Sequence, residues 1–152
     1  MKRLLLLTAL LLAGCAAPKE EFSFRKTQLF LHDTKLEKER GGHPMIDFER
    51  ERLQFGTVTA SERAGKEGHY LNFWWKARRP ANVTVRLEYR QQNTGARVHV
   101  REIDVPNARG TVETKFQITG DDYHKNGRII AWRALLIENG KVVAQTRSFL
   151  WK

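Results

Sequence analysis

The sequence predicts an all-β protein, specifically an antiparallel β-sandwich of seven to eight strands. Beyond residue 22, apolar and polar residues alternate with a period of two along most of the chain, which is the pattern of strands that bury one face. Turn residues interrupt the alternation about every ten residues, as they do in sandwiches of short strands. Residues 22–152 suit one domain in length, and no internal repeat or second hydrophobic segment divides them. We therefore expect a single β-sandwich domain over 22–152.

The early part of this domain contains two strand candidates, residues 22–31 and 53–59. Between them lies the charged stretch TKLEKERGGHP, residues 34–44, interpreted as a loop or short helix that ends at Pro44. Residues 22–51 are thus expected to form an N-terminal strand and a charged loop, both packing on a core made by residues 52–152.

The central strands have the clearest alternation. YLNFWWKA, residues 70–77, and VTVRLEYR, residues 83–90, each place every second side chain on one apolar face. The stretches 97–104 and 112–118 continue the pattern. The expected core positions of these four stretches are Leu71, Phe73, Trp75, Ala77, Val83, Val85, Leu87, Tyr89, Val98, Val100, Val112, Thr114, Phe116 and Ile118.

Two hairpins follow from the turn residues. QNTG, residues 92–95, is expected to join 83–90 to 97–104. Asn139-Gly140 accepts the positive φ angles of a type I′ turn and is expected to join 129–137 to 142–151. With regular pairing across that turn, Trp132 faces Arg147 in a cation–π contact. The core face of this hairpin is then Trp132, Ala134, Leu136, Val143 and Phe149.

The closing segment GRIIAWRALLIENGKVVAQTRSFLW resembles the last hairpin of bacterial immunoglobulin-like accessory domains. Those domains often end in alternating apolar residues, an Asn-Gly or Asp-Gly turn and a strand that finishes with an aromatic residue. The resemblance implies an immunoglobulin-like form of the sandwich, for which residues 53–152 have a suitable length. The chain has one cysteine, so no internal disulfide pair is possible.

That cysteine closes a segment with the features of an export signal. Lys2 and Arg3 precede the apolar stretch 4–12, which is shorter than the roughly 20 residues of a membrane-spanning helix. Leu12-Ala13-Gly14-Cys15 resembles the lipobox of bacterial lipoproteins. The resemblance implies that residues 1–14 are a signal peptide removed before Cys15, and that the Cys15 thiol carries the lipid. Residues 15–21 are then the lipidated cysteine and a tether, whose segment AAPKEE spans at most about 20 Å.

The residue after the cysteine bears on the choice of membrane. Lipoproteins kept in the inner membrane of enterobacteria often have Asp there, whereas this chain has Ala16. In a double-membrane bacterium, the resemblance therefore implies an outer-membrane lipoprotein that faces the periplasm or the cell surface.

An aromatic and basic cluster is the first candidate binding surface. Tyr70, Trp74 and Lys76 point away from the expected core face, and Arg78 and Arg79 follow them. Such residues stack on sugar rings, and they concentrate binding energy at protein interfaces. The alternative is that the N-terminal segment covers Trp74, and this is the outcome we expect. Its large apolar residues are Phe22, Phe24, Leu29 and Phe30.

The second candidate surface is basic. The formal net charge is +10, and arginines recur on two expected neighbouring strands, where they form an arginine ladder: Arg86, Arg90, Arg97 and Arg101. A field of this sign attracts polyanions, and the polyanions of a cell envelope are lipid A phosphates, acidic glycans and lipid head groups. Nucleic acid is a poor partner for an exported protein. The alternative is a solvated face, with Glu88, Glu102 and Asp104 interleaved.

Nothing in the sequence favours catalysis or a cofactor. The histidines lack metal-ligand spacing such as HExxH, and Ser61 and Ser148 lack a GxSxG setting. The cluster in GDDYHKNG, residues 120–127, is interpreted as turn chemistry. The sequence thus predicts a non-catalytic, lipid-anchored envelope protein that acts through protein–protein contacts. The alternative is a module that binds an envelope glycan or lipid A.

Overall fold

A computed structural model describes residues 20–34 and 44–152. The all-β class is confirmed, because strands dominate these residues and the helices are short. The segment 1–19, with the predicted lipobox and Cys15, lies outside the described residues. In chain order the elements are β1 (Phe22–His32), α3 (Pro44–Gln54), α4 (Ala60–Lys66), β2 (Gly68–Gln91), η1 (Gln92–Thr94), β3 (His99–Thr119), α5 (Asp121–Asn126), β4 (Ile129–Glu138) and β5 (Lys141–Arg147).

The five strands form one antiparallel sheet in which β2 is the central strand. β3 pairs along the whole of β2 on one edge. On the other edge, β1 pairs with residues 68–77 of β2 and β4 pairs with residues 84–91. β5 pairs with β4 at the end of the sheet.

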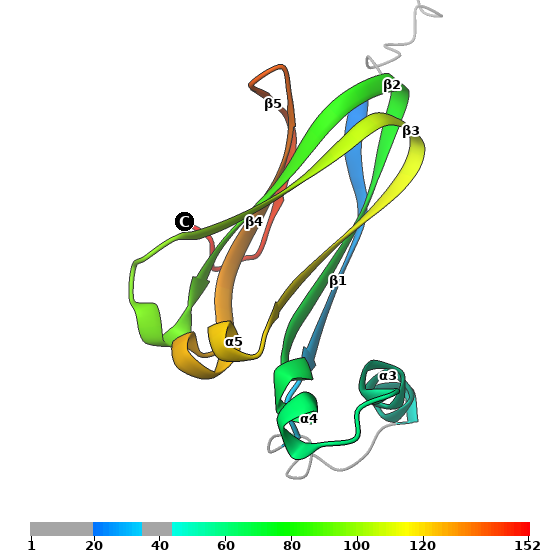
Figure 1. The fold of residues 1–152 in the computed structure, drawn as a ribbon. Helices are drawn as coiled ribbons and strands as arrows, with labels where there is room; N and C mark the ends of the chain where they lie inside the picture. The colour runs from blue at the N-terminus through cyan, green and yellow to red at the C-terminus, as the bar shows by residue number, and fades with distance from the viewer. Residues whose placement is uncertain (1–19, 35–43) are drawn as a thin grey trace, which may run out of the picture.

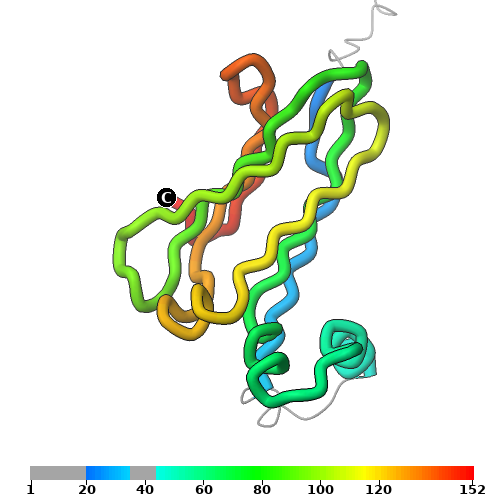
Figure 2. The backbone as a smooth tube through the Cα atoms, in the orientation of Figure 1, coloured from blue at the N-terminus to red at the C-terminus, as the bar shows by residue number. Residues whose placement is uncertain are grey.

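The β2–β3 hairpin folds over near its middle, so that the sheet makes two layers (Figures 1 and 2). The pairing of β2 with β3 shifts register between Ala77 and Ala81 and again before Val83, and Pro80 lacks the N–H that a regular ladder requires. On β3, Asn107 and Gly110 have positive φ angles. We call β1 with residues 68–77 and 110–119 the first layer, and β4 and β5 with residues 81–91 and 99–108 the second layer.

The hydrophobic core lies between the two layers. Phe73 of the first layer packs edge-on against Trp132 of the second, with ring centroids 5.3 Å apart. Trp75 is fully buried, and its indole N–H donates a hydrogen bond to Thr114 at 3.0 Å. The core faces predicted for residues 70–77 and 83–90 are confirmed, because every second side chain there is buried as strand geometry requires.

The structure has fewer strands than the expected seven or eight. Residues 70–77 and 83–90 are two halves of β2, and residues 97–104 and 112–118 belong to the two halves of β3. The proline and glycine signals between them mark bends inside continuous strands. Residues 53–59 are not a strand: α3 ends at Gln54, and Thr59 caps α4. Pro44 begins α3, as proline at a first helical position can, and residues 35–43 lie outside the described part.

The predicted register was wrong in two places. In β3, Glu102 lies opposite Arg86 and Val100 opposite Glu88, so Val98 and Val100 are exposed on the outer face. In the last hairpin, Asn139 and Gly140 have the expected positive φ angles, but a bulge follows at Leu136/Ile137. Arg147 therefore lies opposite Arg133.

The same bulge changes which side chains of the last hairpin are buried. Trp132 pairs with Ser148 through two hydrogen bonds, one of 2.9 Å and one of 3.0 Å, instead of facing Arg147. Trp132, Ala134 and Leu136 are buried as expected, whereas Val143 and Phe149 are exposed. A bulge shifts every later side chain by one position, which moves it to the other face.

Within the described residues, no helix is long and apolar enough to cross a membrane.

Candidate functional site

The outer face of the first layer carries a grid of side chains from three strands. Alternation directs these side chains away from the core, and the cross-strand register aligns them in rows. We call this surface the grid face. Its rows, each given in the order β1, β2, β3, are Lys26, Trp74 and Glu113; Gln28, Asn72 and Lys115; and Phe30, Tyr70 and Gln117.

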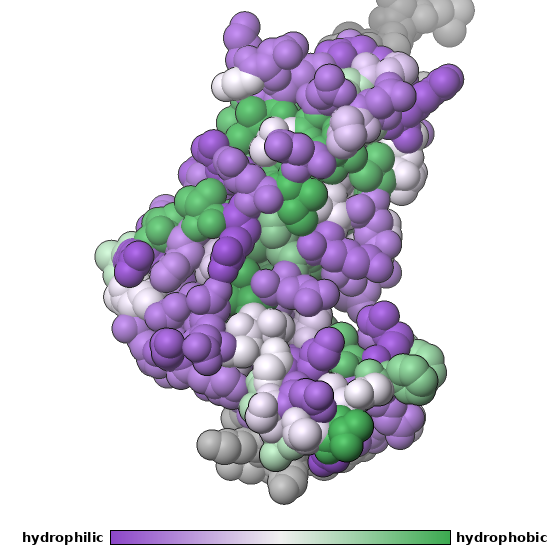
Figure 3. All heavy atoms as spheres, viewed as in Figure 1, coloured by the Kyte–Doolittle hydropathy of each residue, from purple (hydrophilic) through white to green (hydrophobic). Residues whose placement is uncertain are grey.

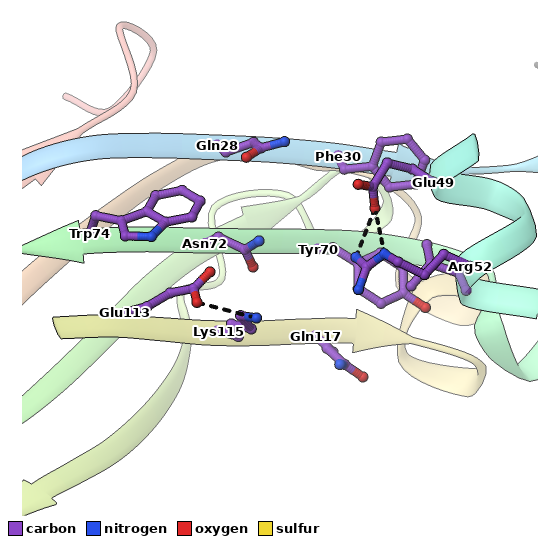
Figure 4. Close-up of a pocket in the computed structure, with 11 residues that line it drawn as sticks. Gln28, Phe30, Glu49, Arg52, Tyr70, Asn72, Trp74, Glu113, Lys115 and Gln117 are labelled. Carbon is purple, nitrogen blue, oxygen red and sulfur yellow. Dashed lines mark hydrogen bonds and ion pairs between the residues drawn. The ribbon is translucent and has the colours of Figure 1, made fainter. Parts of the chain in front are cut away.

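A depression of about 290 Å³ lies between the grid face and α3. Figure 4 shows Trp74, Asn72 and Glu113 along its floor, with Tyr70 and Arg52 at the end near α3. The Tyr70 hydroxyl donates a hydrogen bond of 2.7 Å to the Lys66 carbonyl, and burial raises the pKa of this phenol. The depression therefore has a Tyr70 side chain fixed at the end near α3 and both an indole and polar groups along its floor.

The charged groups around the depression are paired with one another. Glu113 and Lys115 form an ion pair of 3.3 Å on β3. Glu49 and Arg52 form one of 2.7 Å on α3. The depression thus has no strong net charge, although the chain as a whole is basic.

Trp74 is half-buried, and its surroundings differ from the expectation. β1 lies beside β2 in the sheet and does not lie over Trp74, because a bulge between Phe24 and Lys26 directs Phe22 and Phe24 toward the core. The Lys26 ammonium lies 4.8 Å from the indole centroid. The expected burial of Trp74 under apolar N-terminal residues was therefore wrong, and part of the ring is open to solvent.

The other members of the predicted aromatic and basic cluster lie elsewhere. Arg78 and Arg79 lie in the bend of β2, at the end of the molecule where β1 begins (Figure 1). Arg79 makes two hydrogen bonds to Glu138, of 2.6 and 2.7 Å, and one of 2.9 Å to Glu21, which raise its pKa. Arg78 donates to the Glu20 carbonyl. Lys76 lies next to Ser23 and Thr111 on the outer face.

The predicted arginine ladder does not form. Arg86 is paired with Glu102 at 2.5 Å, and Arg101 lies opposite Leu87 on the other face, where it pairs with Asp122 of α5. Arg90 lies over the Trp151 ring at 4.9 Å, and Arg97 is an exposed residue of the β2–β3 connection. Neighbouring acids thus neutralise Arg86 and Arg101, two of the four arginines of the expected polyanion surface.

A second surface was missed by the sequence analysis. Four large apolar side chains of α3 and of the loop that follows it are more than 60% exposed: Met45 (70%), Phe48 (63%), Phe55 (90%) and Val58 (80%). We call this surface the apolar pole; green patches near α3 mark part of it in Figure 3. No residue of α3 is buried, so the helix contributes little to the core.

Signals for these helices were present in the sequence. Pro44 followed by MIDFERERLQ combines an initial proline with good helix formers. TASE, residues 59–62, is a capping-box sequence. The Glu62 carboxylate accepts a hydrogen bond of 2.9 Å from the Thr59 N–H, and the Glu62 N–H donates one of 3.1 Å to the Thr59 hydroxyl.

The remaining polar clusters have structural roles. GDDYHKNG forms α5, and the Tyr123 hydroxyl donates a hydrogen bond of 2.5 Å to Asp33. His69 accepts a hydrogen bond of 3.1 Å from the Ile129 N–H, and burial lowers its pKa to about 4. Among residues 20–34 and 44–152, no group of three His, Cys, Asp or Glu residues is placed to hold a metal ion.

Comparisons with known proteins support the fold alone. No family model matches the chain, and no curated protein matches it. A crystal structure of a protein from Akkermansia muciniphila is similar, with a TM-score of 0.52 and 12% sequence identity. The match covers 87% of this chain and 71% of that one. At such low identity the likeness concerns architecture, and function has to be argued from the surfaces.

Proposed function

We propose that the chain is a non-catalytic, lipid-anchored protein of the cell envelope that binds another envelope protein at its apolar pole. The observation that carries the proposal is the exposure of Met45, Phe48, Phe55 and Val58 within one short segment, residues 45–58. Large apolar side chains that gather on a surface are typical of interaction sites. Because α3 buries none of its residues, its apolar side chains Met45 and Phe48 do not serve the core.

The position of the pole favours a protein over the anchoring membrane as its occupant. Lipidation at Cys15, implied by the lipobox, would attach the chain just ahead of Phe22, where β1 begins. β1 has 11 residues and so is about 35 Å long, and α3 and α4 lie at its far end (Figure 1). The apolar pole would therefore point away from the lipid that holds the protein. An outer-membrane location, facing the periplasm or the cell surface, remains part of this proposal.

The charge pattern favours an apolar partner surface over a polyanion. Asp47 pairs with Arg50 at 2.9 Å, and Glu49 pairs with Arg52, so the polar side chains of α3 largely cancel. The paired arginines of the second layer likewise weaken the case for lipid A. An immunoglobulin-like character also belongs to the proposal; its support is the two-layer antiparallel sheet and the closing β4–β5 hairpin.

Site-specific photo-crosslinking in living cells tests the proposal. A photoreactive phenylalanine analogue replaces Phe55 in the full lipoprotein, and a matched protein carries it at Phe149, which is 95% exposed but lies outside the pole. We expect a protein adduct of one defined mass from position 55 and none of that mass from position 149. Phe48→Ser should abolish the adduct, because it removes an apolar neighbour without disturbing a buried contact.

Three outcomes would contradict the proposal. An adduct of twice the chain mass would make the occupant a second copy of this protein. Adducts with lipid alone would make the pole a membrane contact. An adduct that survives Phe48→Ser would show that contact at position 55 does not depend on the apolar surface.

A further inference from the structure

We propose that the grid face binds an uncharged saccharide in the depression beneath α3. This site is distinct from the apolar pole and goes beyond the protein contacts proposed above. Three features of the depression carry the inference. They are carboxamide groups without hydrogen bonds to the described chain, a partly exposed indole, and charged groups that are paired within the site.

The carboxamides supply the hydrogen bonds that a polyhydroxylated ligand needs. Gln28 and Asn72 are direct cross-strand neighbours, and Gln117 lies one row away. No hydrogen bond joins any of these three amide groups to another part of the described chain. Each carboxamide offers two N–H donors and an acceptor oxygen. Adjacent donors and acceptors on a fixed sheet match the alternating hydroxyl groups of a sugar ring.

Trp74 supplies the apolar side of the site. Its ring lies on the floor of the depression beside Asn72 and Glu113 (Figure 4), and the Lys26 ammonium, at the end of a long side chain on the neighbouring strand, lies 4.8 Å from the ring centroid. The C–H face of a sugar can stack on an indole while its hydroxyl groups reach the amides. Small-molecule sites generally combine such an apolar surface with a few placed polar groups.

The paired charges decide between ligand classes. Lys115 is held by Glu113, Arg52 by Glu49 and Lys26 by the Trp74 ring, so a phosphate or carboxylate would have to draw a cation away from an existing contact. A neutral sugar needs no such exchange, because it can hydrogen-bond to both members of a pair as they stand. The volume of about 290 Å³ lies near the lower limit for small-ligand sites, which suits one or two sugar rings.

α3 forms the other wall of the depression, through Glu49, Arg52 and Leu53. Because no residue of α3 is buried, its packing on the sheet is light, and a ligand that contacts both walls would fix its position. Saccharide binding would then order the helix that carries part of the apolar pole.

Nuclear magnetic resonance of the purified full-length protein tests the inference. The probes are maltotriose, cellotriose and tri-N-acetylchitotriose, each added up to about 10 mM, a range suited to weak binding. At least one probe should shift the side-chain amide signals of Gln28, Asn72 and Gln117 and the indole N–H signal of Trp74. Asn72→Ala should weaken that binding roughly tenfold, since it removes hydrogen bonds to the ligand. Gln145→Ala, which removes an exposed carboxamide on β5, should leave it unchanged.

Other results would overturn the inference. No shift with any of the three sugars at 10 mM would do so, as would shifts that are equal in wild type and Asn72→Ala. Equal binding of inorganic phosphate or of tri-alanine would assign the face to anions or to peptides. The melting temperature of Asn72→Ala should stay within about 1 °C of wild type, because surface substitutions have small effects. Each outcome is independent of the crosslinking at the apolar pole.

Discussion

His69 illustrates at the residue scale how one buried side chain makes stability depend on pH. Burial, with a smaller contribution from the Arg128 cation, lowers its pKa from 6.5 to about 4. Between these values the unfolded chain binds a proton that the folded chain excludes. The free energy of unfolding should therefore be constant above about pH 6.5 and fall as the pH drops toward 4, by at most about 1.4 kcal/mol per pH unit.

Urea unfolding of wild type and His69→Gln across this range checks the prediction. Glutamine keeps an acceptor for the Ile129 N–H but has no proton to gain, so the fall should be clearly smaller in the variant. His99, whose pKa is also lowered mainly by burial, is present in both proteins and cancels in the comparison. Parallel pH profiles in the two proteins would show that His69 does not control the effect.

Gly68 is the position where a single methyl group should do most damage. Its φ is +146°, and a Cβ there would lie 2.2 Å from the Ile118 carbonyl oxygen of the neighbouring strand. Gly68→Ala should destabilise the protein by about 3 kcal/mol, because neither backbone can move away cheaply. Gly65→Ala is the matched control: a Cβ there would have no described atom within 4 Å apart from its chain neighbours and the backbone of its own helix, and alanine favours the helix α4. Thermal unfolding of both variants compares them, and similar melting temperatures would contradict the expected clash.

At the scale of elements, Trp151 is the buried anchor of the segment that follows β5. Trp151 is 7% exposed, and the guanidinium groups of Arg90 and Arg133 lie 4.9 and 5.2 Å from the centroid of its ring. Phe149, two residues earlier, is almost fully exposed. Trp151→Ala should lower the free energy of unfolding by about 2–4 kcal/mol through lost burial and cation–π contacts. Phe149→Ala should change the free energy of unfolding by less than about 0.5 kcal/mol. Denaturant unfolding measures both, and equal losses would mean that the segment is not anchored through Trp151.

The elements also show what the sequence could and could not predict. Strict alternation identified the buried face of β2, because a side-chain period of two needs no knowledge of partners. The bulges at Leu136/Ile137 and between Phe24 and Lys26 follow from pairing with other strands, and each reverses the faces beyond it. Val143 and the apolar cover expected over Trp74 were misplaced for this reason. α3 was missed because residues 34–44 were interpreted as a charged loop and residues 53–59 as a weak strand. The helix formers between them were therefore not recognised as a helix.

At the scale of the whole molecule, the grid face is assembled from strands that are far apart in the sequence. Tyr70 and Trp74 could be singled out because they are neighbours on one strand. Gln28 and Gln117 join them only through the register of β1 and β3 with β2, which no local pattern specifies. The predicted association of Trp74 with Arg78 and Arg79 was wrong for the converse reason: residues near in sequence along a strand separate by about 3.3 Å per position.

The fold and the proposed anchor together predict how the protein is held in the envelope. If Leu12-Ala13-Gly14-Cys15 acts as a lipobox, the mature chain begins at Cys15 and carries two acyl chains on a glycerol. Two acyl chains are enough to anchor a protein stably in a membrane. Cys15→Ala should leave residues 1–14 attached and the chain without acyl groups. Mass spectrometry of the N-terminal peptide measures both properties, and Thr8→Ser, which keeps the signal intact, is the control. A mature wild-type chain with a free Cys15 thiol would contradict the anchor. It would also leave the apolar pole without a fixed direction in the envelope, because β1 orients the pole only relative to a lipid attached ahead of Phe22.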